Sequence, residues 1–179
     1  IVIAVGCYVQ VAKEDVEKLE EIDLVLGTNE KTNIIKYVEE YMASKDDSYV
    51  TEIDDVMHNQ NYGDFGSVTY TEKTRAVIKV QDGCDRFCSY CIIPYARGRV
   101  RSRKPESVIN EITEIAKNGI KEVVITGIHV ASYGKDFKDE YRLIDLLEEI
   151  NNIDGIERIR LGSIEPLLIS EEFITRLTK

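Results

Sequence analysis

A pattern of strand, loop and helix that repeats three times constrains the fold of this chain more than any other feature. Each repeat opens with a short apolar run and closes with apolar residues at helical spacing. Because strands that alternate with helices usually form a parallel sheet, we predict an α/β fold for residues 75–179. In such folds the functional residues follow the carboxyl ends of the strands. The strands are predicted at 75–83, 121–127 and 157–166, and the helices at 105–118, 141–153 and 170–179.

Residues 1–45 repeat the same order in shorter form. This order is typical of a Rossmann-like α/β layer, and we predict part of such a domain there. Residues 46–74 are polar and lack a sustained period, which indicates a linker with at most a short strand. Three strand–helix units cannot close a barrel, so we expect the chain to be a piece of a longer protein. The N-terminal apolar runs are at 1–6 and 23–27, and the helical patterns are at 13–22 and 28–43.

Three of the four cysteines lie close together, as Cys84, Cys88 and Cys91 in GCDRFCSYCIIP. The sequence has no basic leader with a cleavage site and no apolar run of membrane-spanning length, so we expect a cytoplasmic protein. The cytosol keeps thiols reduced, and clustered cysteines there indicate a ligand set, a redox pair or a nucleophile rather than disulfides. Cys88 and Cys91 alone would fit a thioredoxin-like redox site, and Cys7 as a fourth ligand would fit zinc.

A [4Fe–4S] cluster accounts for all three cysteines of this loop. Such clusters are held by cysteine thiolates, commonly four, and three thiolates leave one iron open to a substrate or a cofactor. Gly83 allows a sharp turn just before the first thiol. Apolar neighbours would exclude water and tune the potential of the cluster. These neighbours are Phe87, Tyr90, Ile92 and Ile93.

The charges of the chain are divided unevenly. Residues 1–75 hold 16 acidic and 7 basic residues, whereas the remainder holds 17 and 16, so we expect an anionic partner to approach the second part. An extended conformation at 97–104 would place alternating arginines on one side, where they could follow the phosphates of RNA. The alternatives are a solvated surface paired with acidic residues and a contact to a cofactor carboxylate. The arginines are Arg97, Arg99, Arg101 and Arg103, followed by Lys104.

The segment GCDRFCSYCIIPYARGRVRSR at 83–103 resembles the cluster loop of the radical S-adenosylmethionine (SAM) methylthiotransferases, which carry three cysteines at this spacing. The segments EVVITGIHVASYGKD at 122–136 and RLGSIEP at 160–166 resemble most the MtaB subgroup of that family. VIAVGCYVQ at 2–10 resembles the end of the family's N-terminal domain. The resemblance covers nearly all of this chain and half or less of a complete enzyme.

This resemblance implies a partial Rossmann-like domain followed by the first half of a (β/α)6 radical SAM TIM-like barrel. It also implies two [4Fe–4S] clusters. Cys84, Cys88 and Cys91 would hold the first cluster, and Cys7 would be the third ligand of the second. The other ligands of the second cluster would precede Ile1, so it would form only in the complete chain. Taken alone, Cys7 is more typical of a small buried residue.

The reaction that the resemblance implies is methylthiolation of N6-threonylcarbamoyladenosine at position 37 of tRNA. SAM bound to the first cluster would be cleaved to a 5′-deoxyadenosyl radical that removes hydrogen from C2 of the adenine, and the second cluster would deliver sulfur. The implied partners are tRNA and an electron donor such as flavodoxin or ferredoxin, with no membrane. The alternatives are a subgroup that modifies isopentenyladenosine-37 of tRNA or a ribosomal protein aspartate, and a non-catalytic zinc- or cluster-binding module.

Five residues are candidate contacts of SAM. Tyr90 would pack on the adenine ring or would only fill space. Thr126 and Gly127 end a predicted strand, where the glycine would let the backbone approach the methionine part of SAM or would make an ordinary turn. Ser163 and Glu165 end the next strand, where the carboxylate would meet the ribose or amino group of SAM or would cap a helix.

The two histidines are less informative. His129 follows a predicted strand end closely, where a functional role competes with that of an ordinary loop residue. His58 lies in the predicted linker, and its surroundings give no reason to assign it a function.

Overall fold

The computed structural model describes residues 1–178 apart from the segments 45–49, 59–60, 64–73 and 167–168. The chain divides into two compact units. Unit 1 comprises Ile1–Phe65 and Cys84–Arg99, and unit 2 comprises Gly66–Gly83 and Val100–Lys179. The cysteine loop, which we predicted as part of the domain at 75–179, therefore groups with the N-terminal part of the chain.

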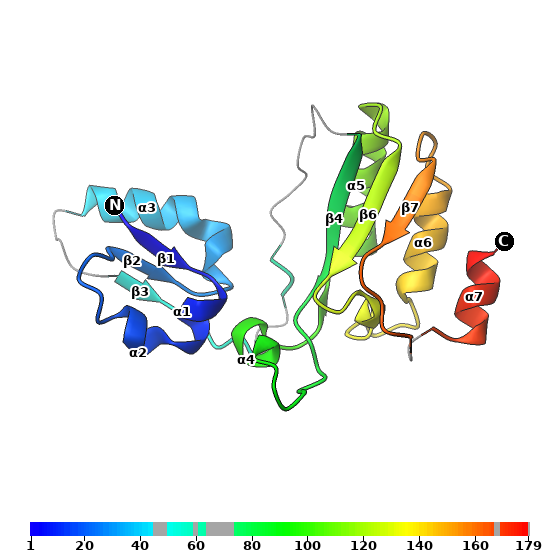
Figure 1. Cartoon of the computed structure of the whole chain (residues 1–179). Helices are drawn as coiled ribbons and strands as arrows, with labels where there is room; N and C mark the ends of the chain where they lie inside the picture. Colours follow the sequence, from blue (N-terminus) through cyan, green and yellow to red (C-terminus); the bar gives the residue numbers. More distant parts are fainter. Residues whose placement is uncertain (45–49, 59–60, 64–73, 167–168, 179) are drawn as a thin grey trace. The chain divides into compact units, whose positions relative to one another are not determined.

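Unit 1 is built on a parallel sheet with the strand order β1-β2-β3 (Figure 1). Strand β3 lies inside the segment predicted as a linker, so unit 1 uses more of the chain than residues 1–45. The strands are β1 (Ile3–Val5), β2 (Leu24–Leu26) and β3 (Val50–Glu52). The helices are α1 (Cys7–Val11), α2 (Lys13–Val16), the 3-10 helix η1 (Glu30–Asn33), α3 (Ile34–Ala43) and α4 (Ile93–Arg97).

Unit 2 contains a four-stranded sheet with the order β5-β4-β6-β7. Strands β4, β6 and β7 are parallel, as the repeated strand–helix pattern predicts, and β5 runs antiparallel along β4. The strands are β4 (Arg75–Asp82), β5 (Arg101–Ser102), β6 (Glu122–Gly127) and β7 (Arg158–Leu161). The helices are α5 (Pro105–Lys117), the 3-10 helix η2 (Val130–Ser132), α6 (Leu143–Asn151) and α7 (Glu171–Leu177).

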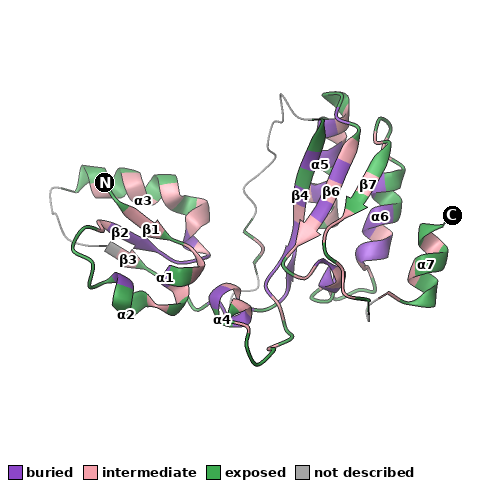
Figure 2. Cartoon of the chain, in the orientation of Figure 1, coloured by how far each residue is buried: buried purple, intermediate pink, exposed green. Residues whose placement is uncertain are grey.

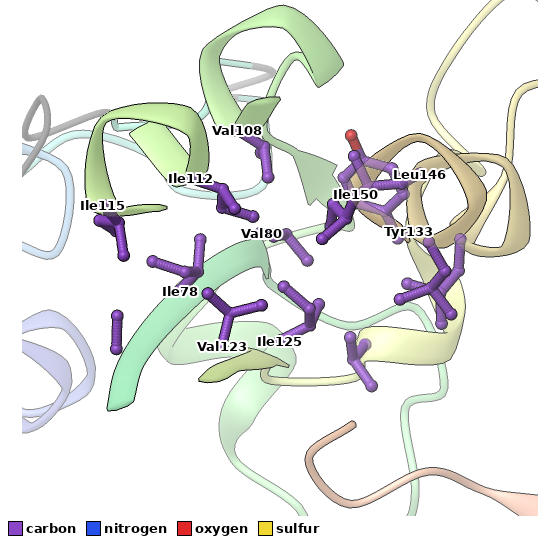
Figure 3. Close-up of a cluster of buried hydrophobic side chains, with 14 of the residues drawn as sticks. Ile78, Val80, Val108, Ile112, Ile115, Val123, Ile125, Tyr133, Leu146 and Ile150 are labelled. Carbon is purple, nitrogen blue, oxygen red and sulfur yellow. The ribbon is translucent and has the colours of Figure 1, made fainter. Parts of the chain in front are cut away.

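The core of unit 2 lies between the sheet and helices α5 and α6, which cover the same face of the sheet (Figure 1). Buried and more exposed residues alternate along the first six residues of β4 and along most of β6 (Figure 2), because successive side chains of a strand point to opposite faces. The burial of each such aliphatic side chain contributes about 1.5–3 kcal/mol to the free energy of unfolding. Side chains from the strands and the helices point toward one another in this core (Figure 3), among them Ile78, Val80, Val123, Ile125, Val108, Ile112, Leu146 and Ile150.

Two residues set the limits of α5 where the sequence predicts them. Pro105 occupies the first turn, where its missing N–H group removes no helical hydrogen bond. Gly119 follows the end of the helix with a φ of 84°, a conformation that glycine adopts without steric cost. In the described part of the chain, no helix combines the length and the apolar character needed to cross a bilayer.

Candidate functional site

The three clustered cysteines lie on the loop between β4 and α4, and all of them are free thiols. Cys88 is exposed, whereas Cys84 and Cys91 are half-buried. Gly83 (φ 72°) and Phe87 (φ 48°) have left-handed backbone conformations, and each directly precedes one of the thiols. The chain thus turns sharply before Cys84 and again before Cys88.

Backbone and side-chain contacts close this loop within unit 1. The N–H of Cys84 donates to the carbonyl of Gly98 at 3.0 Å, which joins the two ends of the loop. Within the loop, the ring of Phe87 packs edge-on against Tyr95, with the ring centroids 5.7 Å apart. The guanidinium of Arg99 lies over the same ring, 4.6 Å from the centroid of Phe87. The loop is therefore held by polar and aromatic contacts on both sides of Cys88.

Helix α4, which follows the third cysteine, is attached to the N-terminal segment. It packs against α1, and the hydroxyl of Thr28 donates to the carbonyl of Ala96 at 2.7 Å in a buried hydrogen bond. Cys7 is the first residue of α1, directly after Gly6 with its φ of 108°, and it is half-buried. Unit 1 thus contains all four cysteines.

The donor chemistry of the loop fits an iron–sulfur cluster, because three free thiols within one loop are the ligands that such clusters use. Among the described residues, no three Cys, His, Asp or Glu side chains are gathered into a ready-made metal site. The loop therefore supplies the donors without presenting them as a preformed cage. Tyr90, between two of these cysteines, is 90% exposed.

The carboxyl end of the unit 2 sheet holds a buried amide that the sequence did not reveal. Gln81 of β4 donates through Nε2 to the carbonyls of Asp82 at 2.6 Å and Gly83 at 2.7 Å. Its Oε1 accepts the N–H of His129 at 2.7 Å. Gly127 of β6 lies against the same side chain, since a Cβ atom there would be 2.9 Å from Oε1 of Gln81. An uncharged polar residue next to the carboxyl end of a strand, where functional groups gather in α/β folds, was the signal that could have identified Gln81.

The ring of His129 connects two further polar residues beyond this strand end. Its Nδ1 lies 2.5 Å from Oγ of Ser132, which is buried, and its Nε2 lies 3.1 Å from Oε2 of Glu165. We singled out His129 and Glu165 separately, and the structure brings them together. Of the other predicted SAM contacts, Thr126 is half-buried beside Gly162, and Ser163 is exposed.

The predicted stripe of four exposed arginines is wrong in its geometry. The segment is not extended throughout, because Arg97 ends α4. Arg101 lies in β5 and is only 3% exposed, and Arg103 is 6% exposed. Arg103 forms an ion pair with Glu111 of α5, which draws its guanidinium into the interior. Arg99 stays exposed, at 53% of its side chain, with Asp85 at 3.6 Å.

Comparison with known proteins identifies the class to which these features belong. Residues 78–179 match the model of the radical SAM superfamily, and this chain belongs to that superfamily. The predicted fold class is confirmed, with an α/β unit 2 in which β4, β6 and β7 are parallel and which forms part of a radical SAM barrel.

Within this class, the chain is similar to methylthiotransferases. It is 40% identical to the threonylcarbamoyladenosine tRNA methylthiotransferase MtaB of Aquifex aeolicus, across 97% of this chain and 44% of that protein. The MtaB of Bacillus subtilis is 36% identical, with 100% of this chain and 39% of that protein covered. The ribosomal protein uS12 methylthiotransferase RimO of Clostridium novyi is 38% identical, with coverages of 99% and 39%. The chain thus spans less than half the length of these relatives.

Among solved structures, the chain is similar to the radical SAM methyltransferase TsrM of Kitasatospora setae, with cobalamin and a [4Fe–4S] cluster bound. The TM-score is 0.31 at 22% identity, over 54% of this chain and 24% of that chain. A likeness of this size says nothing about the function of the chain.

Proposed function

We propose that this chain is part of a radical SAM enzyme that methylthiolates N6-threonylcarbamoyladenosine at position 37 of tRNA. The observation that carries the proposal is the loop of three free thiols that begins directly after β4 of the radical SAM domain. The similarity to two MtaB proteins over nearly the whole chain supports the choice of substrate. The expected location of such an enzyme is the cytoplasm, where tRNA is modified.

In this proposal, Cys84, Cys88 and Cys91 hold a [4Fe–4S] cluster and leave one iron for SAM. When bound and reduced, this cluster supplies the electron that cleaves SAM, a chemistry that belongs to the cofactor. The protein's part is to hold the thiolates and to exclude water. The turns at Gly83 and Phe87 support this role, because they change the chain direction just before two of the ligands.

Residues of unit 2 are the proposed contacts to SAM on the sheet side. Thr126 and Gly127 end β6, at the carboxyl edge of the sheet, where ligands bind in α/β folds. Ser163 and Glu165 follow β7, and the hydrogen bond from His129 to the carboxylate of Glu165 supports a defined position for that group. Tyr90 is the proposed aromatic contact on the cysteine loop, and its exposure leaves the ring available to a ligand.

Cys7 is the proposed third ligand of a second [4Fe–4S] cluster, whose other ligands would come from sequence outside this chain. Its place at the start of α1, in the same unit as the other three cysteines, supports the assignment. tRNA would be bound in part by Arg99 and Arg97, whereas the burial of Arg101 and Arg103 argues against a direct contact with phosphate. Flavodoxin or ferredoxin is the expected class of electron donor.

The similarity to a RimO protein supports a ribosomal protein as a second candidate substrate. The RimO of Clostridium novyi is 38% identical over 99% of this chain, a value between those of the two MtaB proteins. Identity therefore leaves a ribosomal protein aspartate as the alternative substrate of the same chemistry.

The cofactor part of the proposal is tested by anaerobic reconstitution of the full-length gene product with iron and sulfide. We expect a brown, air-sensitive protein that cleaves SAM when it is reduced, and a Cys88→Ser variant that does neither. A colourless protein with stoichiometric zinc would refute the radical chemistry. Nucleoside analysis of tRNA from a strain that lacks the gene tests the substrate. Retained 2-methylthio-N6-threonylcarbamoyladenosine in that strain would exclude the MtaB-like activity.

A further inference from the structure

The amide of Gln81 fixes three backbone groups at the carboxyl end of the unit 2 sheet. Its Nε2 donates to the carbonyls of Asp82 and Gly83, and its Oε1 accepts the N–H of His129 at 2.7 Å. The side chain is fully buried. A buried amide destabilises the fold unless its polar atoms form hydrogen bonds. These three bonds therefore fix the conformation of the side chain and of the backbone around it. Gln81 therefore connects the last residue before Cys84 to the start of the loop after β6.

The ring of His129 continues this connection to Glu165, and the chemistry of the groups assigns the proton positions. An ionised carboxylate only accepts hydrogen bonds, so Nε2 of His129 carries the proton that lies toward Oε2 of Glu165, at 3.1 Å. In the neutral form of the ring, Nδ1 is then an acceptor, and the hydroxyl of Ser132 at 2.5 Å is the donor beside it. The acceptor-only carboxylate of Glu165 thus selects the tautomer, and the buried serine, whose hydroxyl can donate or accept, fits it.

Glu165 is partly exposed while His129 contacts one of its oxygens. Its side chain is 35% exposed, compared with 17% for that of His129. A carboxylate held in this way accepts a charge-assisted hydrogen bond from an ammonium group or a bond from a hydroxyl. SAM carries both kinds of donor, in its amino group and its ribose.

We propose that Gln81 and His129 are positioning residues for the cofactor of this enzyme. Gln81 sets where the chain leaves β4 at Gly83, directly before the ligand Cys84. His129 holds the carboxylate of Glu165 so that it accepts from the amino group or a ribose hydroxyl of SAM. Neither Gln81 nor His129 touches SAM in this assignment, which rests on the proposed function.

The role of His129 is tested by the affinity of SAM for the full-length gene product with its cluster reconstituted and oxidised, measured by equilibrium dialysis. His129→Ala should weaken SAM binding roughly tenfold or more, the loss expected for a hydrogen bond to a charged group. His129→Gln places an amide N–H near the position of Nε2 and should restore most of the affinity. His58→Ala is a matched control, because His58 also pairs with a carboxylate, that of Asp55 at 2.5 Å, on an exposed part of unit 1.

The proton assignment has a test that requires no cofactor. In a 15N-histidine NMR spectrum of the cluster-free full-length gene product, the ring signals that disappear in His129→Gln are those of His129. We expect the Nε2–H tautomer for His129 and a shift of its Nε2 signal in Glu165→Gln. A ring protonated at Nδ1, or a signal insensitive to Glu165→Gln, would overturn the pairing.

The role of Gln81 is tested with Gln81→Glu, which keeps the size of the side chain and its acceptor for His129. It loses the donors to the carbonyls of Asp82 and Gly83. We expect an altered electron paramagnetic resonance spectrum of the reduced cluster and a smaller spectral change when SAM is added. A variant that is only less stable, with an unchanged spectrum and SAM response, would reduce Gln81 to a structural role.

The outcomes separate this inference from the proposed function. A wild-type protein that holds no iron–sulfur cluster overturns the proposed function and the cofactor role of these residues together, while the NMR experiment still reports on the pair. A wild-type protein that holds the cluster and SAM, with equal SAM affinity in His129→Ala, overturns this inference alone.

Discussion

Gly127 lies so close to Gln81 that a Cβ atom on residue 127 would be 2.9 Å from Oε1 and 3.0 Å from Cβ of the glutamine. The buried amide of Gln81 therefore packs against the end of β6 only because residue 127 has no side chain. The sequence suggests two roles for this glycine, an approach to SAM and an ordinary turn, and this contact adds a third.

Gly127→Ala should destabilise the protein by about 1–3 kcal/mol, the usual cost of an added methyl group in a packed interior. The backbone carbonyl of Gln81 would also be only 3.0 Å away, so a rotation of its side chain does not remove the clash. Urea unfolding measures the loss. Gly162→Ala is the matched control, because its Cβ would first meet Oγ1 of Thr126 at 3.2 Å. An equal loss in both variants would contradict this explanation.

The buried ion pair between Arg103 and Glu111 predicts a second effect on stability. Arg103→Met would remove the guanidinium that pairs with the buried carboxylate of Glu111, at a cost of about 3–5 kcal/mol. The double variant Arg103→Met with Glu111→Leu should recover most of this loss, because a buried pair replaced by apolar residues is often neutral. Thermal unfolding of the single and double variants provides the measurement. A single variant as stable as the wild type would show that the pair is dispensable.

Tyr133 predicts a loss of stability at alkaline pH. Burial, and secondarily the charge of Asp136, raises the pKa of its hydroxyl, which donates to the carbonyl of Arg103 at 2.8 Å. Because the folded pKa lies above the ordinary value of 10.0, the unfolded chain releases this proton first. The stabilisation is thus fully present below that value and is lost as the pH rises toward the folded pKa.

Urea unfolding across the alkaline range should therefore show a steeper loss of stability in the wild type than in Tyr133→Phe. At neutral pH the variant should already be about 1 kcal/mol less stable, since it lacks the buried hydrogen bond. Tyr8→Phe, at an exposed residue of α1, should follow the wild type. Equal slopes in the wild type and Tyr133→Phe would contradict the raised pKa.

The sequence predicted the elements whose signals are local. The three strand–helix repeats of unit 2 follow from apolar periodicity, and the limits of α5 follow from Pro105 and Gly119. Helix α4 and strand β5 were not predicted, because each is too short to show a period. Their positions depend on distant partners, such as the carbonyl of Ala96 with Thr28 and the pairing of Ser102 with Gln81.

In the candidate site, too, the sequence predicted what depends on local patterns and missed what depends on contacts between distant residues. The spacing of the cysteines predicts the ligand set directly, and this assignment stays a prediction. The hydrogen bonds that join His129 to Gln81 and to Glu165 span 48 and 36 residues, and no periodicity encodes them. The alternation of arginines suggested an extended stripe, and it failed because Glu111, on the following helix, pairs with Arg103 in the interior. Local patterns identify candidate groups, whereas the packing of distant elements decides which of them meet.

Arg99 carries the remaining prediction, which concerns RNA and rests on the proposed function. Its guanidinium is exposed and stacks on Phe87 at 4.6 Å, next to the cysteine loop. An arginine held against an aromatic ring presents its N–H groups in a fixed direction, which suits contact with a phosphate. Arg99→Ala should weaken the binding of tRNA and reduce the slope of log affinity against log salt by about 0.7–1, the value for one phosphate contact.

The comparison is made by filter binding over a range of salt concentrations. Arg99→Lys keeps the charge but loses the stack, and it should retain the slope with lower affinity. Lys117→Ala is the control, because Lys117 is an exposed cation paired with Glu114 at 2.6 Å on α5 and should leave both values unchanged. Thermal unfolding of each variant separates a loss of contact from a loss of structure. If Arg99→Ala binds tRNA with the wild-type slope, the phosphate contact lies elsewhere on the protein.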